Sequence, residues 1–84
     1  MVTIRVYGVL RLDSGVKTLE AEADSVKDVF RLVLEESRRV KPDSGVTMKD
    51  VKGCMVVVNG KMVKPRAKLN DGDEIMLVPA SGGG

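Results

Sequence analysis

Hydrophobic and polar residues alternate along residues 2–7 at the start of the chain. This period of two places aliphatic side chains on one face of a strand and polar or aromatic side chains on the other, as in a half-buried strand. A second alternating stretch, residues 16–21, follows the turn residues Asp13, Ser14 and Gly15. The sequence therefore predicts that the two strands form a hairpin.

An amphipathic helix is predicted next, beginning after Ser25. Ser25 is a typical N-cap residue, and Asp28 stands three positions later, as in a capping box. Apolar residues then recur with the period of a helix that buries one face. This stripe consists of Val26, Val29, Phe30, Val33 and Leu34. Leu32 falls outside the stripe, and we interpret it as an isolated surface leucine.

The second half of the chain predicts a loop followed by short strands. Residues 40–53 contain turn residues such as Pro42, and a short helical turn is allowed near residues 48–51. The Asn59-Gly60 pair is the strongest hairpin indication in the chain. The strands predicted here are residues 55–58, 61–63 and 74–78.

These elements predict an α+β fold. Two hairpins with one helix between them must bury the apolar stripe of the helix against one face of a mixed sheet. The first and last strands can then pair in parallel at the centre. This is the β-grasp (ubiquitin-like) architecture, a mixed sheet of four to five strands packed on one main helix. We expect residues 1–79 to form a single β-grasp domain and residues 80–84 a flexible C-terminal glycine tail.

Composition limits the size of the core and the classes of partner. The 84 residues suffice for one small domain, and with one Tyr and one Phe its core must be aliphatic. A net charge of +2, from 14 basic and 12 acidic residues, does not indicate nucleic acid or a membrane surface. No apolar run is long enough for a membrane span. A single cysteine cannot form an internal disulfide, so we expect a small soluble cytoplasmic domain.

The sequence lacks the residues for most metal and nucleotide sites. It contains no histidine and one cysteine, which removes the common zinc-ligand sets. Cys54 lies in an apolar run, and we interpret it as a small buried hydrophobe because no histidine could activate it as a nucleophile. No Walker sequence or glycine-rich dinucleotide motif is present, so we expect the chain to bind no cofactor by itself.

The end of the sequence carries the strongest candidate chemistry. A turn and a short apolar strand lead to Pro79, followed by Ala80, Ser81 and the glycines 82–84. Glycines lack a Cβ, so their backbone can approach a partner closely. The terminal carboxylate of Gly84 is then the reactive group. This arrangement suits a C-terminus that is threaded into the active site of another enzyme.

The chain resembles the sulfur-carrier branch of the ubiquitin-like proteins, specifically the family of the molybdopterin synthase small subunit. The resemblance is carried by residues 2–11, 57–61 and 69–79, together with the terminal glycines. It covers nearly the whole chain and is weakest between residues 40 and 53. Asn-Gly and Asp-Gly-Asp are common turn sequences, but their order and their distance from the end make the match specific.

The resemblance implies that the chain is a sulfur carrier and not an enzyme. An ATP-dependent activating enzyme, an adenylyltransferase that itself binds ATP and Mg²⁺, would adenylate the carboxylate of Gly84. Sulfur from the persulfide of a sulfur donor enzyme would displace AMP and leave a thiocarboxylate. In the family, the large subunit of molybdopterin synthase then receives the sulfur and builds the dithiolene of the molybdenum or tungsten cofactor. The family usually ends in two glycines. Here there are three, so either Gly84 is the reactive end or it is trimmed and Gly83 replaces it.

The open face of the predicted sheet is the expected contact surface for these partners. On the last strand Ile75 and Leu77 should face the helix, so Met76 and Val78 should point to the open face. Tyr7 on the neighbouring strand should join them. Several apolar side chains together on an exposed face indicate a binding surface. The expected partner-binding residues are Tyr7, Met76, Val78, Pro79, Ser81 and Gly82.

A basic cluster near the second hairpin allows two interpretations. The cluster consists of Lys61, Lys64, Arg66 and Lys68. The simplest interpretation is a solvated surface. The alternative is a patch that binds an acidic partner or a substrate phosphate. The cluster lacks the aromatic residues of a nucleic-acid platform.

Other functions remain open. A lysine amine could attack the same adenylated glycine, which would make the chain a protein modifier. The sulfur could instead go to thiamine or to tRNA, although residues 40–53 fit the molybdopterin subunit better than the shorter thiamine carrier. A β-grasp scaffold with an idle tail is a fourth interpretation.

Overall fold

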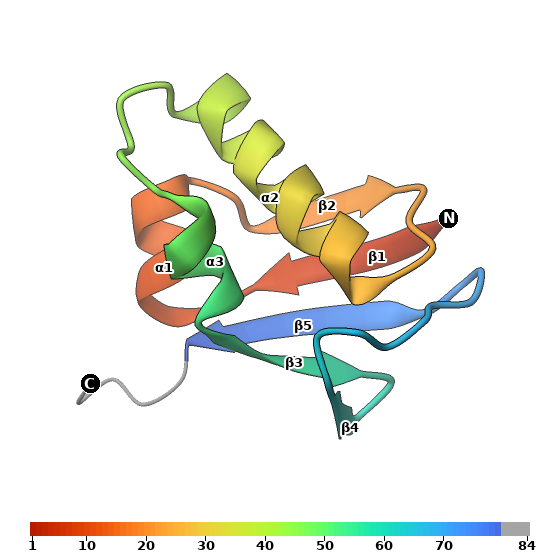
Figure 1. The fold of residues 1–84 in the computed structure, drawn as a ribbon. Coiled ribbons are helices and arrows are strands. Elements are labelled where there is room, and N and C mark those ends of the chain that lie inside the picture. Colours follow the sequence, from red (N-terminus) through yellow and green to blue (C-terminus); the bar gives the residue numbers. More distant parts are fainter. Residues whose placement is uncertain (80–84) are drawn as a thin grey trace.

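Five strands form one mixed sheet, with helix α2 lying across one of its faces (Figure 1). The computed structural model describes residues 1–79. The strand order is β2-β1-β5-β3-β4, in which β1 and β5 pair in parallel and the other neighbours pair antiparallel. This confirms the predicted β-grasp architecture. The strands are β1 (Val2–Val6), β2 (Thr18–Ala21), β3 (Cys54–Val58), β4 (Lys61–Val63) and β5 (Glu74–Pro79).

Helix α2 (Val26–Val40) begins at the predicted N-cap. The backbone N–H of Asp28 donates to Ser25 Oγ at 3.4 Å. The Asp28 carboxylate accepts from the backbone N–H of Asp24 at 3.1 Å, one residue before the position expected for a capping box. The whole predicted apolar stripe is buried. The interpretation of Leu32 was wrong: it is half-buried and packs against the core at the flank of the helix.

Residues 8–14 form helix α1 (Gly8–Ser14), which the sequence analysis missed. The predicted turn at residues 13–15 is in fact the end of this helix. Gly15 has a left-handed φ of 76°, and its N–H donates to the Arg11 carbonyl at 3.0 Å. Strands β1 and β2 are antiparallel neighbours as predicted. They are joined by a helix and not by a tight turn. At the end of this helix the buried Ser14 hydroxyl accepts from the N–H of Val16, which is also buried.

A third helix, α3 (Met48–Lys52), stands where a short helical turn was allowed by the sequence. Thr47 and Asp50 form a complete capping box, in which each side chain accepts from the backbone N–H of the other residue. Val51 is fully buried, so this short helix covers one end of the core.

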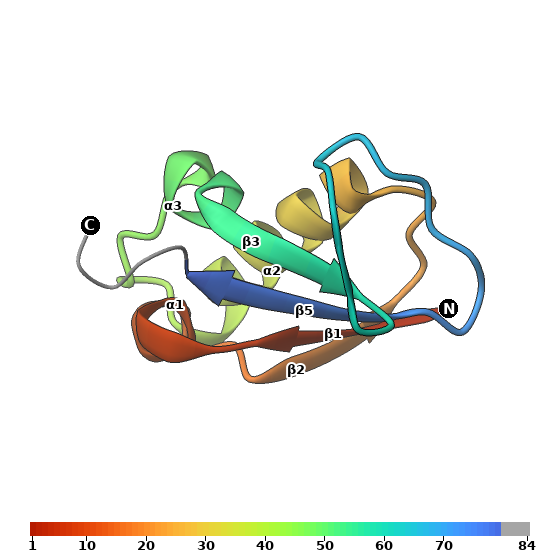
Figure 2. The ribbon, with the colours of Figure 1, turned by 90° about the horizontal axis from the view of Figure 1, so that it is seen from below.

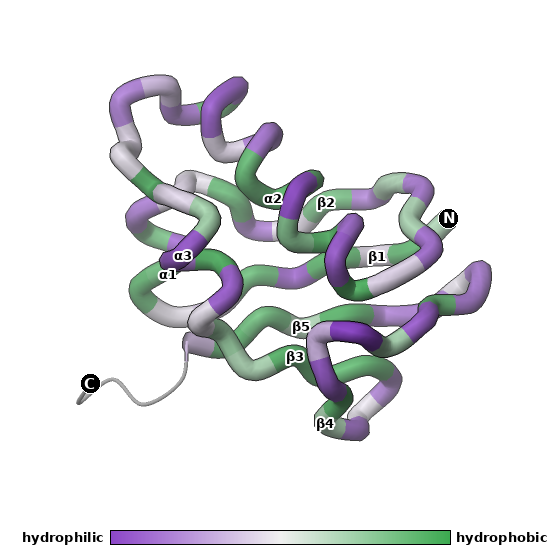
Figure 3. Tube along the Cα trace, in the orientation of Figure 1, coloured by the Kyte–Doolittle hydropathy of each residue, from purple (hydrophilic) through white to green (hydrophobic). Residues whose placement is uncertain are grey.

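The core lies between α2 and the covered face of the sheet. Phe30, Val33, Ile75 and Leu77 are each at most 2% exposed, which confirms that they share one core. Figure 3 shows that β3 and β5 are hydrophobic over most of their length, whereas the loop that follows β4 is hydrophilic. Within residues 1–79, every buried side-chain nitrogen and oxygen has a hydrogen-bond partner.

We expect Phe30→Ala to lower the free energy of unfolding by about 3–5 kcal/mol, because it leaves a cavity under α2 that a thin aliphatic core cannot refill. Urea unfolding measures this loss. Leu12→Ala is the control, since Leu12 is 72% exposed and its truncation should change stability by no more than about 0.5 kcal/mol. Equal losses in the two variants would show that Phe30 is not a core residue.

Candidate functional site

The carboxyl end of β5 is the starting point of the candidate site. β5 lies between β1 and β3, inside the sheet (Figure 2). The N–H of Tyr7 donates to the Leu77 carbonyl at 3.0 Å, which continues the pairing of the two strands up to this end. β5 ends at Pro79. The predicted site residues Ser81, Gly82, Gly83 and Gly84, and the predicted flexible tail at 80–84, lie outside the described residues.

A side-chain network fixes the other end of β5. The carboxylate of Asp73, a residue that is 9% exposed, accepts from the Asn70 backbone N–H and from Asn59 Nδ2, both at 2.8 Å. Asn59 Oδ1 in turn accepts from the Glu74 N–H at 3.0 Å. The hydrogen bond from Asn70, followed by that from Asn59, holds the pKa of the Asp73 carboxyl below its usual value. The Asn-Gly and Asp-Gly-Asp turns are thus one structural unit.

The end of β5 also packs tightly against the start of α1. Gly8 has a φ of +65°, a conformation that residues with a Cβ rarely adopt. A Cβ on Gly8 would lie 3.0 Å from Pro79 Cγ. A larger residue at position 8 would therefore push Pro79, from which the C-terminal segment starts.

An apolar patch covers part of the open face of the sheet, opposite α2. Met76 and Val78 are half-buried and alternate with the buried Ile75 and Leu77, as the predicted faces require. The strand register adds apolar neighbours that the sequence analysis missed: Met55 opposite Val78, Val57 opposite Met76, and Met62 opposite Val57. We call Tyr7, Met55, Val57, Met62, Met76 and Val78 the open-face patch.

The open-face patch has exposed apolar atoms and a polar border. Met55 is 38% exposed and Met62 is 70% exposed. At the border, the Arg5 guanidinium lies 3.6 Å from the Glu74 carboxylate. Tyr7 lines a shallow pocket of about 220 Å³ together with Arg5, Arg11, Lys17 and other residues of this edge. An apolar centre with charged edges is the usual composition of a protein-binding surface.

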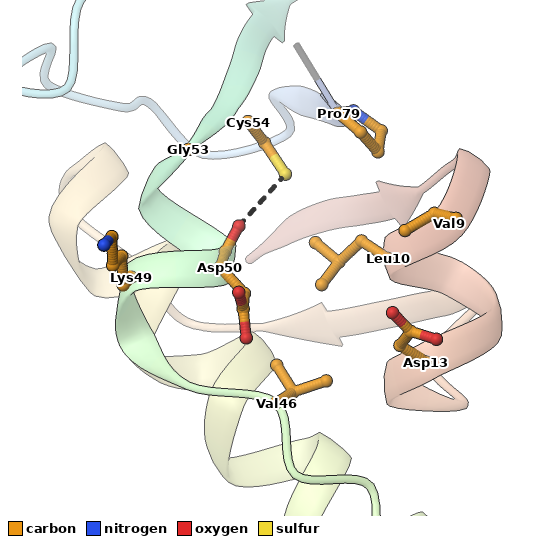
Figure 4. A pocket seen from close by; sticks show the side chains of 9 residues that line it. All are labelled: Val9, Leu10, Asp13, Val46, Lys49, Asp50, Gly53, Cys54 and Pro79. Carbon is orange, nitrogen blue, oxygen red and sulfur yellow. Dashed lines mark hydrogen bonds between the residues drawn. The ribbon is translucent and has the colours of Figure 1, made fainter. Parts of the chain in front are cut away.

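Helix α1 adds exposed apolar side chains that the sequence analysis also missed. Val9 is 64% exposed and Leu12 is 72% exposed, three residues apart on the same helix. Val9 also lines a hollow that includes Pro79 (Figure 4). The apolar surface near the end of β5 therefore extends onto α1.

The hollow in Figure 4 lies between α1 and α3 and has a volume of about 340 Å³. Cys54 points into it, and its Sγ donates to the Asp50 carbonyl at 3.8 Å. Burial and, to a lesser extent, the charge of Asp50 raise the pKa of the Cys54 thiol. The protonated thiol is favoured, which fits the interpretation of Cys54 as a small hydrophobe, although it is half-buried and not fully buried.

Within residues 1–79 no group of three or more His, Cys, Asp or Glu side chains could hold a metal ion. The same residues contain no helix long and apolar enough to cross a membrane.

Comparison with known families gives one match. The model of the ThiS family matches residues 4–84, nearly the whole chain. No curated protein sequence matches at a significant level.

Solved structures show the same fold. A chain of the complex of subunits 1 and 2 of molybdopterin-converting factor from Helicobacter pylori is 26% identical, with a TM-score of 0.58, and the match covers 99% of this chain and 97% of that one. A chain of the BexX/CysO complex of Amycolatopsis orientalis is 26% identical, with a TM-score of 0.65 and full coverage of both chains, 100% each. Small archaeal modifier protein 1 from Methanosarcina acetivorans is 21% identical, with a TM-score of 0.71 and coverage of 99% and 95%, which shows a common fold.

We expect Asp73→Asn to destabilise the protein at neutral pH and to reduce the loss of stability in acid. A carboxyl whose pKa is lowered by folding stabilises the folded state above its unfolded pKa of about 4, and this contribution disappears as the pH falls through the lower folded value. Urea midpoints measured from pH 7 to pH 2 test this. Asp43→Asn, on an exposed loop, is the control and should leave the pH profile unchanged. If Asp73→Asn lost as much stability between pH 7 and pH 2 as the wild type does, the Asp73 carboxylate would not stabilise the folded protein.

Proposed function

Because the chain belongs to the ThiS family of ubiquitin-like sulfur carriers, we propose that it carries sulfur as a C-terminal thiocarboxylate for molybdopterin synthesis. The observation that carries the proposal is the family match, which extends through the terminal glycines. A chain of the molybdopterin-converting factor complex is 26% identical, which supports this pathway, and a chain of the BexX/CysO complex is equally identical. The large subunit of molybdopterin synthase is the proposed acceptor.

The proposed chemistry takes place on the terminal carboxylate, which Gly84 carries in this sequence. A carboxylate oxygen attacks the α-phosphate of ATP, which releases pyrophosphate and leaves an acyl-adenylate. The outer sulfur of a donor persulfide attacks the carbonyl carbon, and AMP leaves. A thiol then cleaves the resulting acyl disulfide, which leaves the thiocarboxylate on the glycine and a disulfide between the thiol and the donor. If the activating enzyme requires a two-glycine end, Gly84 is trimmed first and Gly83 undergoes the same steps.

In this proposal the chain itself is a co-substrate and provides no acid, base or metal. Its contribution is positioning. The Asp73 network and the Gly8–Pro79 contact hold β5 at both ends, so the segment after Pro79 starts from a fixed point. The activating enzyme binds ATP and Mg²⁺, and a separate enzyme supplies the persulfide.

The open-face patch is the proposed docking surface for these enzymes, with Pro79, Ser81 and Gly82 entering the partner's channel. The two solved structures at 26% identity are complexes, in which chains of this fold have a partner. The patch lies on β5, β3 and β4 and includes Tyr7, which directly follows β1, so a partner bound there is beside the start of the C-terminal segment.

A protein modifier is the second candidate. The structural similarity to a small archaeal modifier protein shows the fold alone. Both functions require the same acyl-adenylate, and they differ in whether sulfur or a lysine amine attacks it.

Incubation with the cognate activating enzyme, ATP and a persulfide donor should raise the intact mass by one exchange of oxygen for sulfur at the terminal glycine. Removal of Gly83 and Gly84 should abolish the exchange and leave the thermal midpoint unchanged, because the core lies within residues 1–79. Gly84→Val should also block it, since a β-branched residue restricts the backbone and crowds the channel. Recovery of the carboxyl group mainly on lysines of other proteins, without a thiocarboxylate, would establish the modifier function instead.

Met76→Glu should leave the fold intact and weaken docking to the activating enzyme or the large subunit at least about tenfold. An unpaired carboxylate in an apolar contact costs about 1–3 kcal/mol or more. Calorimetric titration of the partner measures the affinity. Val40→Glu places the same charge at a 44% exposed site at the end of α2, outside the open-face patch, and should bind normally. If Met76→Glu and Val40→Glu bound the partner with equal affinity, the open-face patch would not be the docking surface.

A further inference from the structure

A hollow lined by cationic side chains lies on the helical layer, on the side of the molecule opposite the open-face patch. It is a hollow of about 200 Å³ between α2, α3 and the loop that follows β4. Phe30, which is only 2% exposed, forms its floor together with Pro65. The exposed side chains of Lys27, Lys52 and Arg66 complete its lining. We call these five residues the cationic groove.

A neighbouring hollow of about 320 Å³ shares Lys27 and Lys52 with the cationic groove and extends it along α2. Its further lining residues are Asp28, Arg31 and Met48. Lys27 and Lys52 thus border both hollows, and Met48 provides the apolar side chain of the second.

The parts of the cationic groove are held in place by backbone hydrogen bonds. The Val26 N–H donates to the Ala67 carbonyl at 3.0 Å, and the Leu69 N–H donates to the Asp24 carbonyl at 2.9 Å. These bonds fix the loop that carries Pro65 and Arg66 against the start of α2 (Figure 3). The capping box of α3 fixes the short helix that carries Lys52. A groove that is already formed loses little entropy when it binds a ligand.

The lining of the cationic groove carries three positive side chains and no acidic one. Within residues 1–79, none of Lys27, Lys52 and Arg66 forms an ion pair. The nearest acid in the lining, Asp28, lies 3.8 Å from the Arg31 guanidinium, which also contacts Glu35. The loop adds the exposed Lys64 and Lys68 beside the groove. The local excess is therefore positive.

Helix stability does not explain all of these cations. Lys52 lies in the last turn of α3, where a positive charge interacts favourably with the helix dipole. Lys27 lies in the first turn of α2, where a positive charge is unfavourable. The helix dipole therefore does not account for the position of Lys27 next to Lys52 and Arg66.

We propose that the cationic groove binds an acidic segment of a partner protein, in which carboxylates flank an aliphatic side chain. The aliphatic side chain lies on the exposed Pro65, above the almost fully buried Phe30, and the carboxylates pair with Lys27, Lys52 and Arg66. Nucleic acid fits less well, because the Phe30 ring is buried and offers no face on which a base could stack. The groove and the open-face patch lie on opposite layers, so both can be occupied together. This inference does not rest on the proposed sulfur-carrier function.

The test is an NMR titration of the isotope-labelled 84-residue chain with a synthetic peptide, Glu-Glu-Leu-Glu-Glu. We expect saturable shifts at Lys27, Phe30, Lys52 and Arg66. The variant K27E/K52E should weaken binding about tenfold or more, because it reverses charges that contact the ligand directly. The control R38E/K61E makes the same change in net charge at exposed positions outside the groove, and should stay within about twofold of the wild type.

Two further measurements separate this surface from the others. A peptide with serine in place of leucine should bind more weakly, because it lacks the aliphatic side chain. This comparison uses the wild-type protein. Met76→Glu should bind the peptide with the same affinity as the wild type. Peptide binding to the cationic groove is therefore tested independently of the proposed docking at the open-face patch. The proposal is overturned by an absence of saturable shifts, by equal losses in the two double variants, or by tighter binding of a single-stranded RNA of equal charge to the same residues.

Discussion

The parallel pairing of β1 with β5 at the centre of the sheet is the constraint on which the rest of the structure depends. Two parallel neighbours cannot be joined by a tight turn, so the chain between them must leave the sheet and return. Nearly the whole chain lies between β1 and β5, and within it helix α2 crosses the sheet from β2 toward β3. The helix covers the face that carries Ile4, Val6, Ile75 and Leu77, all of which are 0–2% exposed. Loss of this apolar contact would separate the two ends of the sequence and remove the core.

The same pairing explains how a small domain can present a chain end precisely. A central strand is hydrogen-bonded on both sides, which makes it the part of a sheet that opens least readily. The Asp73 network holds the beginning of β5, and the close contact of Gly8 with Pro79 holds its end. The chain belongs to a family of ubiquitin-like sulfur carriers, and in the proposed function a well-defined end of β5 places the start of the C-terminal segment beside the partner's active site.

The two layers of the fold have different surface chemistry. The open-face patch consists of methionines, valines and one tyrosine, which suits a partner that buries apolar area. The cationic groove combines a small apolar floor with unpaired positive charge, which gives orientation and specificity to a charged ligand. The sheet separates the two surfaces, and Phe30 links the cationic groove to the core.

The sequence by itself determined the elements whose patterns are local. The α2 stripe, the Ser25 cap, the Asn59-Gly60 turn and the alternation of β5 each depend on residues a few positions apart, and all are present in the structure. Helix α1 was missed because seven residues make only about two turns, too few to show a period.

What only the tertiary structure decided is which distant residues meet. The register of β3 with β4 and β5 adds Met55, Val57 and Met62 to the open face. The fold of the loop after β4 separates Arg66 from its sequence neighbour Lys61 and places it beside Lys27 and Lys52. Charges adjacent in sequence point in different directions in a hairpin and loop. Charges far apart converge only once the core has fixed the helices, and no local pattern records that convergence.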